Sequence, residues 1–232
     1  MILSAHQPCF APFPGFFYKA WRSDFFIILD DVQFPQGTTW ISRNRFKSHQ
    51  GALWITVPVW KKGLGLQKIS EVRICHEGRW AKKHLESLKT AYRKAPYLSE
   101  HLGFMEEMFS EKKEKLMDLN LALIRYLMKA LDIQTKAVLL SDLNISSTGT
   151  RRLVDLCTKL GASEFIAQTP AKKFIDEKLF QDAGVEISFF NPPALIYPQL
   201  WGDFIANLSA FDLVLNCGPK AHDILLSHSA GL

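Results

Sequence analysis

MILSAHQPCFAPFPGFFYKAWRSDFFIILDD, residues 1–31, is the stretch that decides the fold. It predicts two strands, over residues 2–5 and 25–29, joined by a helix over residues 15–22. Both strands are continuous apolar runs, which are typical of a parallel sheet covered by helices on both faces. We therefore expect an α/β fold.

Polar side chains follow both predicted strands at the point where each strand ends. His6 and Gln7 come directly after the first strand, and Asp31 and Gln33 come after the second. Residues just past the carboxyl ends of neighbouring parallel strands share one crevice, where ligands bind. The segment therefore predicts a binding site at this edge of the sheet.

Strand-sized and helix-sized segments alternate along most of the remaining chain. Residues 35–50 are polar and predict a loop, whereas residues 77–131 are strongly helical, with an interruption near Ser110 or Asp118. The alternation predicts one α/β domain over residues 1–232, with a mainly parallel sheet, flanking helices and a helical insertion at about 77–131. The sequence is compatible with two roles for the insertion, a lid over the site and the contact face of a homodimer. The further predicted elements are strands over 53–57, 69–74, 136–140, 164–167 and 185–189, and helices over 148–160 and 171–182.

Composition places the chain among compact globular proteins, because it is 47% hydrophobic and 22% charged. Its apolar stretches are strand-sized, so we expect no membrane insertion. Met1 opens directly into a strand without a basic n-region or an apolar h-region, so we expect no secretory signal. The four cysteines are scattered without metal or disulfide spacing, so we expect a cytoplasmic location. A net charge of +5 suits a small anionic substrate such as a sugar nucleotide, although ordinary surface lysines explain it equally well. No nucleic-acid-binding motif is present, so nucleic acid is not an expected partner.

His6 is the first candidate for chemistry, because a histidine titrates near neutral pH and can act as a general acid or base. A structural histidine that holds the loop is the alternative. Lys19 and Asp31 are predicted to lie near it and complete the candidate catalytic group. Asp30 and Asp31 point to opposite faces if the strand continues, so only Asp31 is expected in the crevice. That arrangement disfavours a shared metal ion, and no particular cofactor is indicated.

Arg43, Asn44 and Arg45 form a second candidate group, since guanidinium groups bind phosphates and carboxylates through paired hydrogen bonds. Pairing with surface carboxylates is the alternative. A third candidate is Ile145–Arg151, ISSTGTR, which resembles the phosphate-contacting ISSTxxR segment of some nucleotidylyltransferases. Against it, the first loop has no second histidine at HxGH spacing, and Ser147 or Thr148 would also serve as a plain N-cap.

A fourth group lies near the C-terminus and contains Tyr197, Gln199 and Asn216. Buried amides must be hydrogen-bonded, so these side chains either satisfy backbone groups or contact a ligand. We expect them to line the same cleft as the N-terminal group.

Taken together, several motifs resemble those of the WbqC-like family of bacterial proteins. They are HQPxFxPFPGFFYK (6–19), DFFIILDDVQF (24–34), WxxRNR (40–45), LWITVPV (53–59) and YPQ…F…LSxFDLVLNCG (197–218). The resemblance implies a role in gene clusters for O-antigen and other surface polysaccharides, with a transferase acting on sugar precursors as the expected activity. The family often carries a YLSGxxGxxYL-like stretch where this chain has residues 165–175 without the glycines and tyrosines.

Our leading hypothesis is a transferase that acts on a nucleotide-linked or amino sugar, by acyl or aminoacyl transfer. His6 or Asp31 would be the general base, and Lys19 would help to hold the anionic part of the substrate. Two alternatives are a nucleotidylyltransferase-like enzyme and a non-catalytic scaffold of a glycan-assembly complex, bound through the aromatic loop of Phe10, Phe13, Phe16 and Phe17. The predicted substrate-binding residues are Gln7, Gln33, Arg43, Asn44, Arg45, Tyr197, Gln199 and Asn216.

Overall fold

The computed structural model describes residues 1–227. The chain divides into two compact units. The first unit consists of residues 1–7, 15–31 and 133–193, and the second of residues 8–14, 32–132 and those from 194 onward. Both units are therefore discontinuous in sequence. The single α/β domain expected over residues 1–232 stays a prediction.

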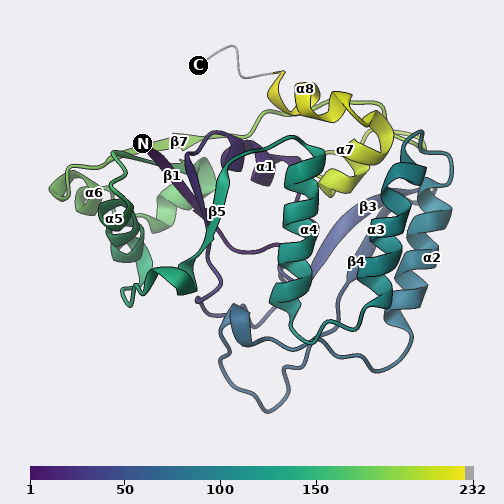
Figure 1. The fold of residues 1–232 in the computed structure, drawn as a ribbon, viewed down its shortest axis with the longest axis horizontal. Coiled ribbons are helices and arrows are strands. Elements are labelled where there is room, and N and C mark those ends of the chain that lie inside the picture. The colour runs from purple at the N-terminus through teal and green to yellow at the C-terminus, as the bar shows by residue number, and fades with distance from the viewer. Residues whose placement is uncertain (228–232) are drawn as a thin grey trace. The chain divides into compact units, whose positions relative to one another are not determined.

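A five-stranded sheet forms the first unit (Figure 1), in the order β5-β2-β1-β6-β7. All of its strand pairs are parallel, which confirms the predicted fold class. If these five strands are renumbered 1 to 5 along the chain, their order in the sheet is 3-2-1-4-5. The direction of this order reverses between β1 and β6. Such a reversal is the switch point of a doubly wound sheet. The elements of the unit are β1 (Ile2–His6), α1 (Pro14–Trp21), β2 (Phe25–Ile28), β5 (Lys136–Leu139), η2 (Leu140–Leu143), α5 (Gly149–Leu160), β6 (Glu164–Gln168), η3 (Thr169–Phe174), α6 (Glu177–Asp182) and β7 (Glu186–Phe190).

Apolar burial accounts for the position of the central strands. Phe26, Ile27 and Ile28 of β2 are fully buried, as is Leu3 of β1. Full burial of such a side chain contributes roughly 1.5–3 kcal/mol, and here it occurs on both faces of the sheet. The continuous apolar runs of the sequence therefore lie at the centre of the sheet, and the polar residues that follow them lie at its carboxyl edge.

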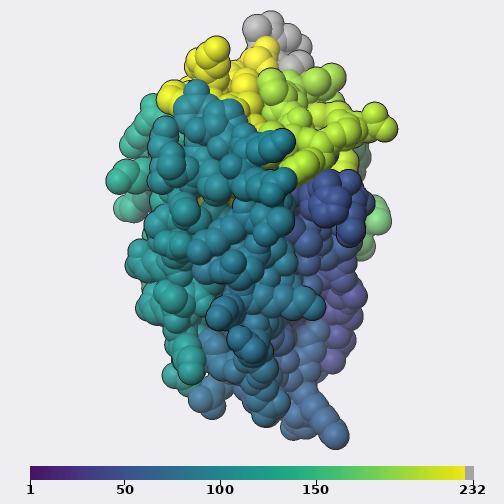
Figure 2. All heavy atoms as spheres, turned by 90° about the vertical axis from the view of Figure 1, so that its right-hand side faces the viewer, coloured from purple at the N-terminus to yellow at the C-terminus, as the bar shows by residue number. Residues whose placement is uncertain are grey.

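The second unit combines an antiparallel hairpin with helices (Figure 1). Helix α2 packs against α3 and β3, and α7 contacts β3, α3 and α4. The Trp201 indole donates a hydrogen bond of 2.7 Å to the Ala91 carbonyl, so the segment around residue 201, yellow-green in Figure 2, lies beside the end of α2. The elements are β3 (Arg43–Ser48), β4 (Gly51–Thr56), η1 (Ile69–Glu71), α2 (Trp80–Tyr92), α3 (Leu98–Ser110), α4 (Leu116–Ala130), α7 (Ala210–Cys217) and α8 (Lys220–Leu226).

Residues 77–131 form the predicted helical insertion, and its interruption falls at Ser110, where α3 ends. No helix within residues 1–227 combines the length and the apolar character that a bilayer crossing requires.

Three predicted elements were wrong. Residues 35–50 are not all loop, because β3 occupies Arg43–Ser48; its Asn44 and Phe46 are buried, but the polar residues between them hide the alternation. Residues 69–74 form the short helix η1 and isolated bridges instead of a strand. The helix expected over 171–182 is split into η3 and α6, because the Asp176 carboxylate accepts a hydrogen bond from the Lys178 N–H and starts a new helix there.

Candidate functional site

A cavity of about 700 Å³ lies in the first unit, and we call it the switch-point cavity. Its walls come from the carboxyl ends of β1 and β6, from α1, from the start of α5 and from η3. This is the edge at which doubly wound sheets bind ligands. Of the predicted site residues, the cavity brings together His6, Gln7 and Lys19.

His6 ends β1 and is held in one orientation. Its Nδ1 lies 2.9 Å from the Gln7 carbonyl oxygen, which can only accept, so Nδ1 carries the proton. The ring packs edge-on against Phe16, with 5.0 Å between ring centroids. Burial, and next the charge of Lys19, lower the pKa of His6 to about 3. His6 is therefore a neutral imidazole at physiological pH.

Lys19 brings a positive charge into the same cavity from α1. Its side chain is only 4% exposed, and its Nζ donates a hydrogen bond of 2.7 Å to the Ala5 carbonyl oxygen. The ammonium lies 5.9 Å from the centre of the Phe26 ring. A positive charge at this position favours an anionic group in the cavity.

Helix α5 directs its N-terminus at the cavity, because Gly149 and Thr150 are lining residues. Thr148 occupies the N-cap position, but its hydroxyl accepts no hydrogen bond from the first turn. Arg152 also lines the cavity and its Nε donates a hydrogen bond of 2.6 Å to the Ser147 carbonyl oxygen. First-turn N–H groups without a cap, together with a guanidinium, form an arrangement that suits a phosphate.

The segment after β6 forms the outer wall of the cavity. Gln168 ends β6, and its amide donates a hydrogen bond of 3.3 Å to the Gly15 carbonyl oxygen at the start of α1. Phe174, at the end of η3, lines the cavity although it is 77% exposed. The Thr150 hydroxyl accepts a hydrogen bond from the Asp176 N–H at 3.0 Å, which ties this wall to α5.

Asp30 and Asp31 differ in their surroundings. The Asp30 carboxylate is buried and accepts a hydrogen bond of 3.0 Å from the Ser141 N–H, at the start of η2. Asp31 is partly exposed and is not among the residues that line the switch-point cavity. A catalytic role for Asp31 stays a prediction. Within residues 1–227, no three His, Cys, Asp or Glu side chains are placed to hold a metal ion together.

Arg43, Asn44 and Arg45 belong to β3 in the second unit. The Asn44 amide is buried and donates hydrogen bonds to the carbonyl oxygens of Phe10 and Ala11 at 3.0 and 2.8 Å, so it positions the first loop. The Arg43 guanidinium lies 3.5 Å from the centre of the Trp54 ring. Arg45 donates to the carbonyl oxygens of residues 206 and 207.

The C-terminal candidates also lie in the second unit and are hydrogen-bonded to their neighbours. The Gln199 amide oxygen accepts a hydrogen bond of 3.0 Å from the buried Lys47 Nζ, and the Asn216 amide donates to the Asp212 carbonyl oxygen at 2.7 Å. Tyr197 is buried, and burial raises the pKa of its hydroxyl. These bonds give the group a structural role. Its role in substrate binding stays a prediction, and so does a cleft shared with the N-terminal group.

Gln33 is exposed and forms an isolated antiparallel bridge with Lys68 in the second unit. The aromatic rings of the first loop are mostly internal, because Phe10, Phe16 and Phe17 are at most 2% exposed. Phe13 is partly exposed, and the scaffold hypothesis stays a prediction.

Several cavity residues were missed in the sequence. Arg152, Gln168 and Phe174 line the cavity but follow no recognised motif. The only available signal was ISSTGTR, which lies directly before Arg152. The segment reaches the cavity only because β6 pairs with β1, and no local sequence pattern indicates that pairing.

Comparison with known proteins places the chain in a family. The model of the WbqC-like protein family matches residues 7–224. A curated relative, the uncharacterized protein Rv1507c of Mycobacterium tuberculosis (strain ATCC 25618 / H37Rv), is 34% identical over 222 residues, which cover 94% of this chain and 95% of the relative. No solved structure matches the chain. Because the family model covers most of the chain and the relative is similar over nearly its whole length, the chain belongs to the WbqC-like protein family.

Proposed function

We propose that the chain is a transferase that acts on a nucleotide-linked sugar during the synthesis of surface-polysaccharide precursors. The observation that carries the proposal is the uncapped N-terminus of α5, which faces the same cavity as His6, Lys19 and Arg152. The helix end and the two cations suit the phosphates of a nucleotide sugar. The cavity volume of about 700 Å³ lies within the range of roughly 300–1,000 Å³ that is typical of small-molecule sites.

His6 supplies the general base in this proposal. Without a bound anion the pKa of His6 is about 3, which makes the imidazole a weak base. A bound phosphate raises that pKa, because a nearby negative charge favours the imidazolium. The base therefore becomes effective only when the substrate is present.

The proposed step joins an acyl or aminoacyl group to the sugar. His6 takes the proton from a hydroxyl or amine of the sugar as that oxygen or nitrogen forms the new bond to the acyl carbon. The bond between the acyl carbon and its activating group breaks, and the activating group leaves with the electron pair. Lys19 and α5 hold the nucleotide phosphates during this step, while Gln7 and Gln168 orient the sugar.

Neighbouring arginines provide a matched test. Arg152 lines the cavity, whereas Arg151 is paired with Asp155 at 2.8 Å on the exposed side of α5. We expect Arg152→Ala to weaken the binding of a uridine diphosphate sugar at least about tenfold in calorimetric titration, since a charge-assisted hydrogen bond contributes roughly 1.5–3 kcal/mol. Arg151→Ala should bind like the wild type. Equal affinities for all three proteins, or no binding of any nucleotide sugar to the folded wild type, would contradict the proposal.

Nucleotidylyl transfer is the second candidate, and one observation favours it. The segment ISSTGTR leads into α5 at the cavity, next to His6, as the resemblance to nucleotidylyltransferases implies. Release of pyrophosphate from ATP or CTP in the presence of a sugar phosphate distinguishes this reaction from acyl transfer. Pyrophosphate release that depends on Arg152 would replace the first proposal by the second.

A further inference from the structure

A second cavity, of about 250 Å³, lies entirely within the second unit. It is lined by the segment before α2 and the first turn of α2, by the end of α3 and the connection that follows it, and by Leu119 of α4. Its floor is apolar, because Ile74, Met108 and Leu119 are each buried. We call it the α2–α3 cavity.

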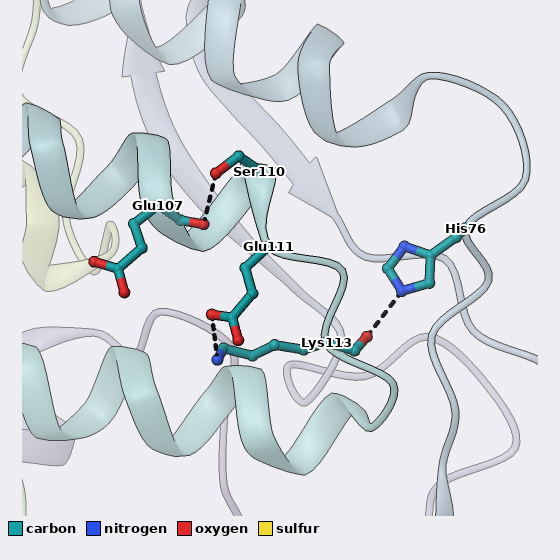
Figure 3. A network of polar contacts seen from close by, with 5 residues as sticks. All are labelled: His76, Glu107, Ser110, Glu111 and Lys113. Atoms are coloured by element: carbon teal, nitrogen blue, oxygen red, sulfur yellow. Dashed lines mark hydrogen bonds and ion pairs between the residues drawn. The ribbon is translucent and has the colours of Figure 1, made fainter.

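Hydrogen bonds and ring contacts hold the two segments together (Figure 3). The His76 Nε2–H donates to the Lys113 carbonyl oxygen at 2.8 Å, and the figure shows the imidazole turned toward that carbonyl. The Trp80 indole donates to the Cys75 carbonyl oxygen at 3.0 Å, and its ring packs edge-on against Phe109. The cavity is therefore bounded by fixed side chains, with an indole in one wall.

The charges around the α2–α3 cavity are mostly positive. Among the described residues that line it, the one carboxylate belongs to Glu111 and forms an ion pair of 2.6 Å with Lys113 (Figure 3). Arg79, Lys82 and Lys112 also line the cavity, and within residues 1–227 none of them is in an ion pair. Three exposed cations without an ion-pair partner among the described residues therefore form a positive rim.

Charge and shape together define the ligand. An apolar floor beneath a cationic rim is complementary to a molecule with a hydrophobic body and an anionic head. The volume lies just below the range of roughly 300–1,000 Å³ for typical ligand pockets, so the body must be small. We propose that the α2–α3 cavity binds a small amphipathic anion, in which one aromatic ring or a short alkyl chain carries a phosphate or carboxylate. This site is separate from the switch-point cavity and does not depend on the function proposed for it.

Four soluble probes separate the parts of this proposal when they are titrated into the full-length chain. Phenyl phosphate has both the body and the head, inorganic phosphate has only the head, benzyl alcohol is neutral and benzylamine carries the opposite charge. We expect phenyl phosphate to bind at least about tenfold more tightly than each of the others. In ¹H–¹⁵N spectra it should shift the indole signal of Trp80, which the variant Trp80→Phe identifies.

Charge-reversal variants locate the binding site. Arg79→Glu combined with Lys112→Glu should weaken phenyl phosphate binding at least about tenfold, because it reverses the charge at the rim. Lys83→Glu combined with Lys94→Glu is the matched control: both lysines are exposed and outside the cavity, and the net charge changes by the same amount. The control should bind like the wild type.

Three results would overturn the inference. Benzyl alcohol that binds as tightly as phenyl phosphate would show that the charges at the rim do not favour an anionic ligand over a neutral one. An equal loss of affinity in both double variants would show that only the overall charge matters. Absence of any phenyl phosphate binding to the folded wild type would show that the cavity is not a site for this class of ligand.

Discussion

The Tyr92 hydroxyl donates a hydrogen bond of 2.8 Å to the Asp212 carboxylate, although 120 residues separate the two along the chain. Both side chains are completely buried. The same hydroxyl accepts a hydrogen bond of 2.9 Å from the Lys47 N–H, so it connects α2, α7 and β3. Burial raises the pKa of Asp212, and the tyrosine hydroxyls and the Lys47 charge oppose that rise. One phenol thus links the hairpin of the second unit to two of its helices.

Removal of that hydroxyl should destabilise the chain. Tyr92→Phe leaves the Asp212 carboxylate and the Lys47 N–H without this partner, and a buried group that loses its hydrogen bond costs roughly 1–3 kcal/mol. Chemical denaturation measures the loss in the free energy of unfolding. Tyr18→Phe is the control, because Tyr18 is also buried but has no hydrogen bond from its hydroxyl within the described chain. A similar loss in both variants would show that the network around Tyr92 adds nothing specific.

Gly218 ends α7 with a positive φ of 52° and lies against the ring of Tyr97. A Cβ at this position would come within 2.3 Å of the Tyr97 ring, so Gly218→Ala should cost roughly 2–4 kcal/mol through overpacking and backbone strain. Gly103→Ala, inside α3 with no neighbouring atom within 4 Å, should instead stabilise by roughly 0.5–1 kcal/mol. Thermal unfolding of the two variants should therefore shift in opposite directions. A shift in the same direction would contradict the packing at Gly218.

His6 should make stability depend on pH. Its pKa falls from 6.5 to about 3 on folding, so between these values the unfolded chain binds a proton that the folded chain does not. The contribution of neutral His6 to stability is therefore present above pH 6.5 and is lost as the pH falls toward 3, with a slope of up to about 1.4 kcal/mol per pH unit. His6→Asn should show a shallower loss than the wild type in denaturation measured from pH 7 to pH 4. His49→Asn, at an exposed histidine, should follow the wild type.

Phe174 should affect ligand binding without affecting stability. It lines the switch-point cavity but is 77% exposed, so its removal loses little buried area. If it packs on the base or sugar of a nucleotide sugar, Phe174→Ala weakens binding by roughly 1–3 kcal/mol, the usual contribution of stacking on an aromatic ring. Ile196→Ala is the control, because Ile196 is 80% exposed and lies outside that cavity. Equal affinities of the two variants for the nucleotide sugar would exclude a contact through Phe174.

Local patterns predicted most of the sheet. The strands expected at 2–5, 25–29, 136–140 and 164–167 correspond to β1, β2, β5 and β6 within one residue at each end, because apolar runs between polar stops are local signals. Strand order is a tertiary property, so the meeting of β1 with β6 could not be inferred. His6, Gln7 and Lys19 lie in the first predicted strand–helix segment, so local patterns identified them as cavity residues. Arg152 and Gln168 reach the cavity through the pairing of β6 with β1, so they were missed.

Only the first strand of the hairpin, β3, was hidden by its polar side chains; the second, β4, corresponds to the strand expected at 53–57. Lys47 is 1% exposed in a strand, yet a lysine ordinarily indicates solvent. Its Nζ is satisfied by the Gln199 amide and by the Asp203 carbonyl oxygen, both more than 150 residues away. A buried lysine with such distant partners has no local signature.

The pairing of β2 with β5, in which Ile28 lies opposite Leu139, has a consequence for synthesis of the chain. Ribosomes add roughly 5–20 residues per second, so β2 waits on the order of ten seconds before its second partner strand, β5, is made. Throughout that time β2, with its fully buried Phe26, Ile27 and Ile28, has only β1 to pair with. We therefore expect the yield of folded protein to depend on translation speed between residues 32 and 132 more than on codon choice after residue 140.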